Sequence, residues 1–133
     1  MGRRGVAVAI AVLLVGAAAP VASAQEVVVD LADEAALVGA GEAVTIDVTV
    51  SCPKKHDVLE ALVYVVQDDH TSQFAGIPIR KCKGRPRTHT VTVRAFEDHP
   101  FHAGEAYSSA YVLVTTPSGG TLSDGDSHAI TIH

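Results

Sequence analysis

The stretch EAVTIDVTVSC, residues 42–52, alternates apolar and polar side chains without a break from Val44 onward. Every second residue from Val44 to Val50 is apolar, while threonines and an aspartate occupy the positions between them. A period of two residues is typical of a β-strand with one face buried and the other in solvent. The stretch therefore predicts a half-buried strand that carries Cys52 on its core side.

Six other segments predict strands, because they are short, rich in Val, Ile, Thr and Tyr, and separated by turn-forming residues. They are residues 26–31, 58–67, 74–79, 87–96, 105–116 and 127–133. Seven strands and no clear amphipathic helix indicate an all-β fold. We expect an antiparallel β-sandwich of the immunoglobulin-like kind.

Two of these segments and one loop have distinctive side-chain patterns. Residues 87–96 alternate like 42–52, with His89 on the same face as Val91 and Val93. Residues 58–67 are apolar on both faces, which favours a central strand, although a short helix is an alternative. The Ser-, Gly- and Asp-rich segment 117–127 predicts a loop.

The N-terminus resembles an export signal. Two arginines precede an apolar run over residues 5–19, and the small residues that signal peptidase requires follow at 22–24. This pattern predicts a secretory signal peptide over residues 1–24, cleaved between Ala24 and Gln25. The apolar run is shorter than the roughly 20 residues that span a bilayer.

The part of the chain after this signal, residues 25–133, has the length of a single domain. We expect one secreted β-sandwich domain with no membrane anchor in the mature chain. In an exported domain of this size a pair of cysteines most simply forms a disulfide. The chain has two cysteines, Cys52 and Cys82, so only one connectivity exists.

The segment FHAGEAY, residues 101–107, resembles a tyrosine corner. Phe101 precedes Tyr107 by six residues, and Tyr107 begins a strand after a glycine-containing bend. In immunoglobulin-like sandwiches the phenol of such a tyrosine bonds to the backbone of the bend. The pattern predicts the same contact from Tyr107.

Several segments together resemble a known family. They are the export signal followed by VTVSCP, VYVVQ, KCKG, HTVTVRA and FHAGEAY. In this layout the chain resembles small secreted β-sandwich proteins of actinobacteria that carry a domain of unknown function. The resemblance implies an extracellular domain with one disulfide and brings no active site.

Motifs of catalysis are missing from the sequence. It contains no G-x-S-x-G nucleophile elbow, no H-E-x-x-H, no phosphate-binding loop and no dinucleotide fingerprint. We therefore expect a non-enzymatic protein without a cofactor. A small extracellular hydrolase or an inhibitor is an alternative, because suitable side chains are present in any domain of this composition.

Histidines provide a second alternative, a secreted metal-binding protein. The candidate ligands are His70, His99, His102 and His128, which lie close to aspartates or to one another in the sequence. A copper or zinc site would need two or three of these imidazoles to converge. Their spacing matches no established ligand pattern, so the sequence predicts no metal site.

Charge points to a different kind of site. Without the two arginines of the export signal, fifteen acidic side chains face eight basic ones, a formal charge of −7. This balance argues against a nucleic acid as partner. Seven of the eight basic residues nevertheless form two clusters, namely Lys54 and Lys55, and then Arg80, Lys81, Lys83, Arg85 and Arg87.

A disulfide between Cys52 and Cys82 would bring both clusters to one end of the sandwich. The sequence thus predicts a binding module with a basic patch. Its partner would be an anionic polymer of the cell envelope or an acidic extracellular protein surface. The alternative is that these charges keep a loop soluble and protect a strand edge from pairing.

Overall fold

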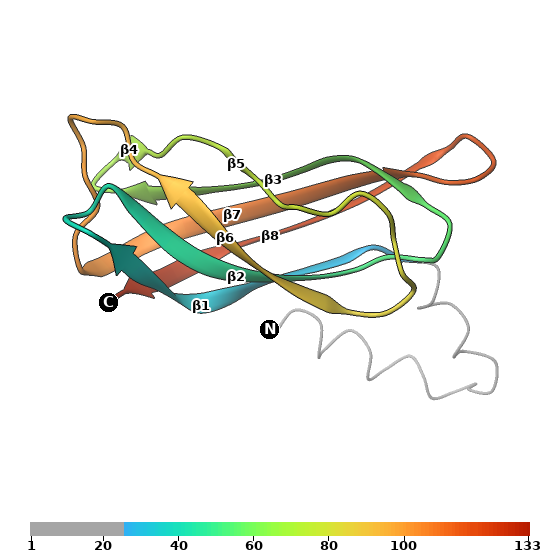
Figure 1. Cartoon of the computed structure of the whole chain (residues 1–133), viewed down its shortest axis with the longest axis horizontal. Coiled ribbons are helices and arrows are strands. Elements are labelled where there is room, and N and C mark those ends of the chain that lie inside the picture. Colours follow the sequence, from blue (N-terminus) through green and yellow to red (C-terminus); the bar gives the residue numbers. More distant parts are fainter. Residues whose placement is uncertain (1–25) are drawn as a thin grey trace.

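The computed structural model describes residues 26–133, which form β-strands connected by turns and irregular segments (Figure 1). The strands are β1 (Val28–Val38), β2 (Ala43–Ser51), β3 (Asp57–Gln67), β4 (His70–Thr71), β5 (Ala75–Gly76), β6 (Arg87–Arg94), β7 (Gly104–Thr115) and β8 (Thr121–Ile132). The predicted all-β class is confirmed. The predicted signal peptide 1–24 and its cleavage site at Ala24 and Gln25 lie outside the described residues. Within that described part, no helix is long and apolar enough to span a membrane.

The strands form one eight-stranded sheet with the order β4-β3-β7-β8-β1-β2-β6, and β5 pairs with β3 beside this path. The sheet curls, so that β3, β7 and β8 form one wall and β1, β2 and β6 form the other (Figure 1). β1 and β8 are parallel, with Glu34 opposite Thr131 and Ala35 opposite Ile132. A fully antiparallel arrangement was expected, and that expectation is wrong at this pair.

β1 and β8 are both longer than the sequence predicts. The expected strand 26–31 continues as β1 to Val38, with a register shift between Leu31 and Ala35. β8 begins at Thr121, so the expected loop 117–127 is mostly strand. The chain turns within only a few residues before Thr121, where the amide of Thr116 donates to the carbonyl of Gly120 over 2.9 Å.

The sequence does not predict the first half of β8 as a strand, because the side chains on its inner face are polar. Asp124 Oδ2 accepts a hydrogen bond from the amide of Val29, and Asp126 Oδ2 accepts one from the amide of Leu31, both over 2.9 Å. These amides lie on the edge of β1 that turns away from β2. The two carboxylates therefore replace the ladder bonds where β1 and β8 have not yet come together.

The middle of the chain agrees better with the predictions. β3 confirms a strand rather than a helix at 58–67. The expected strand 74–79 is reduced to Ala75 and Gly76, because Pro78 has no amide hydrogen to donate. The segment still follows β3, since the amide of Ile77 donates to the carbonyl of Ala61 over 2.9 Å.

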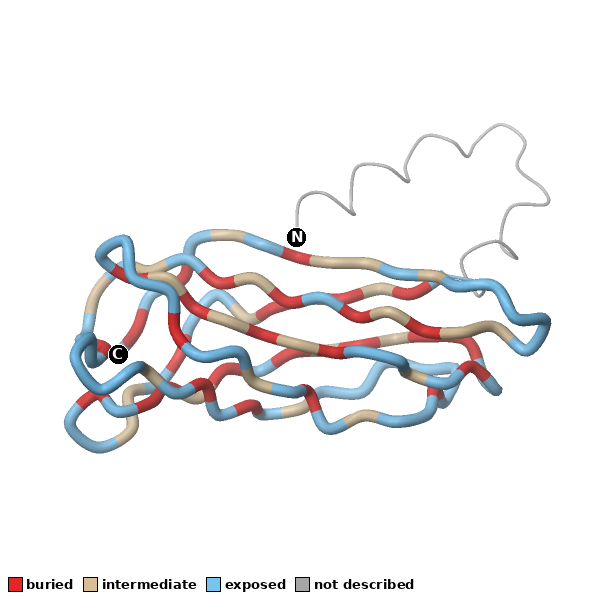
Figure 2. The backbone as a smooth tube through the Cα atoms, turned by 90° about the horizontal axis from the view of Figure 1, so that it is seen from above, coloured by how far each residue is buried: buried red, intermediate tan, exposed pale blue. Residues whose placement is uncertain are grey.

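The core lies between the two walls and consists mainly of valine. Buried and exposed positions alternate along the strands (Figure 2), as expected for a sheet with one face in solvent. Val29, Val44, Val63, Val93 and Val112 come from five different strands and are completely buried. The alternation seen in 42–52 and 87–96 is therefore the packing pattern of the core.

The curled sheet leaves a seam between β6 and residues 73–83, which follow β3. One end of the seam is closed by the amide of Gln73, which donates to the carbonyl of Arg94 over 2.9 Å. The other end is closed by the Cys52–Cys82 disulfide and by the amide of Gly84, which donates to the carbonyl of Cys52 over 3.0 Å. Between these closures the seam opens toward the core.

Candidate functional site

The predicted disulfide is confirmed and fixes one end of the seam. Cys52 directly follows β2 and Cys82 lies before β6, with their Cα atoms 5.2 Å apart. Both cysteines are buried. The amide of Cys82 also donates to the carbonyl of His56 over 3.0 Å, so the two loops are held together by the backbone as well.

The disulfide brings basic residues together around one cavity of about 310 Å³, which we call the disulfide-end pocket. Five of the seven predicted residues border it, and we call them the basic rim: Arg80, Lys81, Lys83, Arg85 and Arg87. The remaining wall consists of Val50, Cys52, Ile79 and His89. The pocket is therefore apolar inside and positively charged at its border.

The first basic cluster lies next to this pocket without bordering it. Lys54 packs against the loop of the basic rim, since a Cβ atom placed on Gly84 would come within 3.0 Å of Lys54 Cγ. Lys55 is exposed in the turn that follows Cys52, with a φ of 68°. The structure thus gathers all seven predicted residues at one end.

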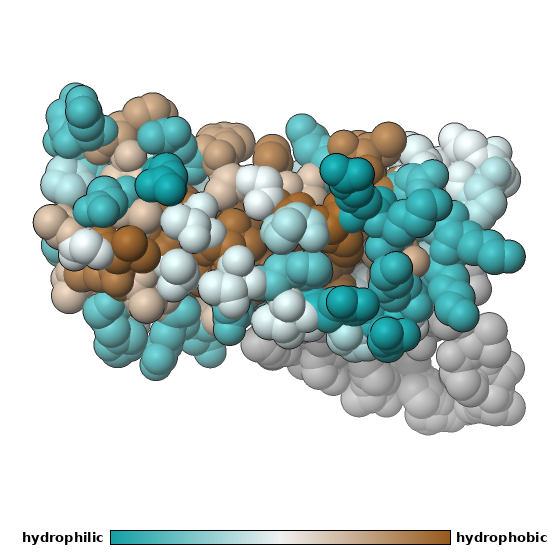
Figure 3. Space-filling model, viewed as in Figure 1, coloured by the Kyte–Doolittle hydropathy of each residue, from teal (hydrophilic) through white to brown (hydrophobic). Residues whose placement is uncertain are grey.

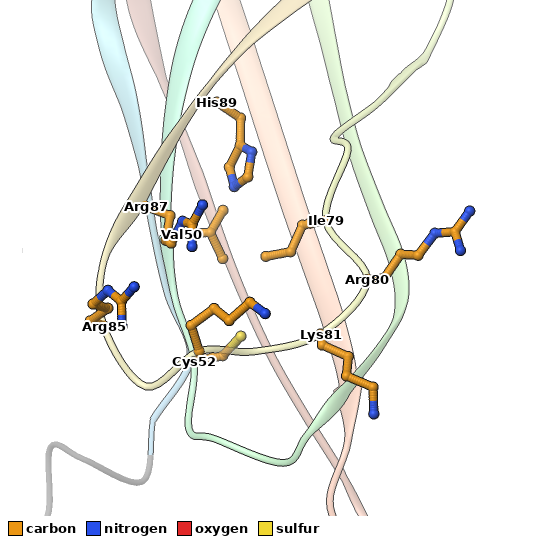
Figure 4. Close-up of a pocket in the computed structure, with 9 residues that line it drawn as sticks. Val50, Cys52, Ile79, Arg80, Lys81, Arg85, Arg87 and His89 are labelled. Atoms are coloured by element: carbon orange, nitrogen blue, oxygen red, sulfur yellow. The ribbon is translucent and has the colours of Figure 1, made fainter.

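The basic rim is not uniform. Figure 4 shows the side chains of Arg80 and Lys81 pointing away from the pocket, while Arg87 lies beside Val50 at its border. Lys81 Nζ is 3.2 Å from Asp57 Oδ1, and both side chains are mostly exposed. An ion pair in such an exposed position contributes little to stability. The charges nearest the cavity are those on β6 and on the loop before it.

The space-filling view supports this division of the surface. Hydrophilic residues gather over the end where the chain runs from β5 to β6, and apolar residues are visible along the middle of the same face (Figure 3). A surface with apolar residues next to a charged cluster is suited to binding. The sequence predicted the charged cluster but not the apolar cavity beside it.

His89 is a site residue that sequence analysis did not select. It lies on the inner face of β6 together with Val91 and Val93, as its position in the alternation predicts. Its Nε2 atom is buried and has no hydrogen-bond partner within residues 26–133. The signal that could have revealed it is a polar residue on the buried face of a regular strand.

The histidine candidates lie elsewhere. Three of them meet at the opposite end of the sheet, where the rings of His70 and His99 stack with centroids 3.5 Å apart. His102 Nε2 is 2.6 Å from Asp68 Oδ2 at the same end. That hydrogen bond is the main reason that the pKa of His102 is raised above 6.5, and a bond to the carbonyl of Ala103 adds to it.

His128 is separate from the other three candidates. Its Nε2 is 3.3 Å from Asp33 Oδ1, and its Nδ1 is 3.7 Å from Asp126 Oδ1. Across residues 26–133, no three His, Cys, Asp or Glu side chains are grouped so that they could hold a metal ion. The structure therefore brings three histidines to one end without forming a ligand set there.

The predicted tyrosine corner is not formed. Phe101 is buried, but Tyr107 points outward with 48% of its surface exposed, and no hydrogen bond joins its phenol to residues 26–133. The bend is held instead by the buried side chain of Gln67. Its Nε2 donates to the carbonyls of His102 and Glu105 over 3.0 and 3.1 Å, and its Oε1 accepts from the amide of His102.

Comparisons with known proteins identify no family. No family model matches the chain, and no curated protein matches it. Among solved structures it is similar to the sporulation control protein Spo0M from Bacillus subtilis, with 20% identity and a TM-score of 0.36. The match covers 81% of this chain and 49% of that one, so the chain spans about half of its length. The resemblance to the actinobacterial family stays a prediction.

Proposed function

We propose that the protein is a secreted, non-enzymatic binding module that holds an anionic partner at the basic rim. The observation that carries this proposal is that five basic residues border one apolar pocket in a chain of net negative charge. A concentrated positive patch attracts polyanions even when the whole molecule repels them. The partner would be an anionic polymer of the cell envelope or an acidic extracellular protein.

Secretion and architecture belong to the same proposal. The Cys52–Cys82 disulfide supports an extracellular location, because disulfides persist in oxidising compartments. We infer that the two walls of the curled sheet act as the layers of an immunoglobulin-like sandwich. Such a framework would present the basic rim from loops at one end.

The chemistry of the basic rim favours phosphate or carboxylate groups. Arg85 and Arg87 flank Pro86, whose ring restricts the backbone between them. Guanidinium groups bind such anions through two parallel hydrogen bonds, which lysine cannot do. A repeating polyanion would contact several of these groups at once, and its affinity would decrease as salt screens the exposed charges.

Charge reversal tests the proposal. The double variant Arg85→Glu and Arg87→Glu should bind a teichoic acid at least about tenfold more weakly, a loss of about 1.4 kcal/mol. Titration calorimetry at low salt measures this change. Arg94→Glu is the matched control, because Arg94 lies at the other end of β6 and is exposed. Equal affinity of the double variant and the control would refute the basic rim as the binding site.

The metal-binding alternative rests on the stack of His70 and His99 beside His102. Native mass spectrometry of the secreted protein separates it from our proposal. A stoichiometric metal that is lost in His70→Ala and His99→Ala variants would favour metal binding. A hydrolase or inhibitor remains the other alternative, and no grouping of side chains within residues 26–133 favours it over binding.

A further inference from the structure

The inner face of β6 changes from charged to apolar along its length. Side chains two residues apart lie on the same face of a strand, so Arg87, His89, Val91 and Val93 form one row. The two valines belong to the core, whereas Arg87 and His89 border the disulfide-end pocket. The row therefore leads from a cation at the surface, through an imidazole, to the apolar interior.

The rest of the pocket wall is apolar. Val50 lies near the end of β2 and Cys52 directly follows this strand, and both are buried. Ile79 is half-buried across the seam. Figure 4 shows Ile79 and His89 directed toward the same space between the two sides of the seam. The cavity volume of about 310 Å³ is near the lower limit of the range that is typical of small-molecule sites, about 300–1,000 Å³. Its size suits one short chain or one ring.

His89 supplies an unused polar contact in this apolar wall. A buried polar atom without a partner is costly, and most such atoms in folded proteins are satisfied. The unpaired Nε2 of His89 would gain its missing hydrogen bond from a polar group of a bound molecule. The pocket thus combines an apolar wall, one buried hydrogen-bonding atom and a border of cations.

We infer that the disulfide-end pocket binds a small amphiphilic anion, a phosphate or carboxylate attached to a single apolar chain or ring. The apolar part packs against Val50, Ile79 and the disulfide. The acidic group lies at the border, where Arg87 and its neighbours neutralise it and His89 bonds to it. This inference rests on the proposed function and deepens it by naming the chemical class that the basic rim holds.

Three probes test the inference by titration calorimetry on the secreted, oxidised protein: octyl phosphate, inorganic phosphate and octanol. Octyl phosphate should bind one to one and at least about tenfold more tightly than either of the others, because it alone uses both parts of the site. If octyl phosphate binds no more tightly than inorganic phosphate, the apolar wall does not contribute to binding and the inference is overturned. If octyl phosphate binds no more tightly than octanol, the basic rim does not bind the acidic group and the inference is overturned.

Two variants locate the binding. Ile79→Trp fills the cavity without changing any charge, and the half-buried position tolerates a larger side chain. It should abolish octyl phosphate binding, whereas Arg94→Glu, at the other end of β6, should leave that binding within about twofold. His89→Leu fills the same part of the wall with an apolar side chain and removes the ring nitrogens. It should weaken the binding of octyl phosphate by about tenfold. Unchanged affinity in both variants, with unchanged melting temperatures, would overturn the inference.

The same measurements separate the inference from the proposed function. Teichoic acid binding that depends on Arg85 and Arg87, with no gain for octyl phosphate over phosphate, would keep the proposed function and refute the inference. The source of the amphiphile is decided by vesicles that contain phosphatidylglycerol. Cosedimentation that octyl phosphate blocks would identify a membrane lipid, whereas octyl phosphate binding without cosedimentation identifies a free amphiphile.

Discussion

His102 shows how one exposed side chain responds to its neighbour. Its Nε2 lies 2.6 Å from Asp68 Oδ2, and this hydrogen bond raises the pKa of His102 above 6.5. A raised pKa in the folded protein means that the contact stabilises the fold fully below pH 6.5. The contribution is lost as the pH increases through the pKa of the folded state. Because both side chains are largely exposed, solvent screens the contact.

A titration followed by NMR tests this at the residue scale. The imidazole signals of His102 should titrate with a pKa above 6.5 in the native protein. Asp68→Asn removes the charged acceptor and should shift that pKa downward. Asp69→Asn is the control and should leave the pKa of His102 unchanged. The same downward shift in both variants would contradict the assignment to Asp68.

At the scale of elements, the edge of β1 depends on the carboxylates of β8. Asp126 is buried, and its Oδ2 accepts the amide hydrogen of Leu31. Without this acceptor the amide would stay buried near the junction of the two walls with no partner. Leaving a buried donor unsatisfied typically costs about 1–3 kcal/mol.

Asp126→Ala should therefore lower the free energy of unfolding by about 1–3 kcal/mol, measured by urea denaturation at neutral pH. Asp33→Ala serves as the matched control, because Asp33 also faces His128 but its side chain is 78% exposed. Its effect should stay within about 0.5 kcal/mol. A loss in the Asp126 variant no larger than that in the control would show that the bond to Leu31 does not support β1.

The strands differ in how well the sequence predicts them, and the difference follows from their buried faces. β2 and β6 are predicted well, since side chains alternate strictly along both strands. β2 buries an apolar face along its length, and β6 buries Val91 and Val93. The start of β8 is missed, because Asp124 and Asp126 occupy inner positions where the pattern requires apolar residues. The second half of β1 is missed too, since its sequence ADEAA at 32–36 shows no strand alternation.

The candidate site is only partly predictable for a related reason. Each basic cluster lies next to a cysteine in the sequence, and only one disulfide is possible. This is enough to predict that the basic residues gather at one end. The cavity depends on the distance between β6 and residues 73–83, which is set by the curl of the whole sheet. Val50, Ile79 and His89 therefore become site residues only in the folded chain.

For the whole molecule, the disulfide connects stability with the site. Cys52 and Cys82 join the end of β2 to the chain entering β6 across 30 residues. Replacing both by alanine should lower the free energy of unfolding by about 3–4 kcal/mol. It should also weaken teichoic acid binding, because the loop with Arg85 and Arg87 loses its anchor.

Thermal unfolding and calorimetry of the double alanine variant measure the two effects. A variant that is less stable but binds with native affinity would show that the backbone bond from Gly84 to Cys52 suffices to position the loop. Unchanged stability would contradict the structural role of the disulfide. The Arg94→Glu variant again provides the control for binding.

The central claim is that the basic rim and the disulfide-end pocket hold an anionic partner. The most direct test is an NMR titration of the oxidised protein with a teichoic acid, following the backbone amides. We predict that the largest shifts occur at Lys83, Arg85, Arg87 and His89, and that they decrease as salt is added. The largest shifts at His70 and His99 at the opposite end, or shifts spread evenly over the sheet, would contradict the claim.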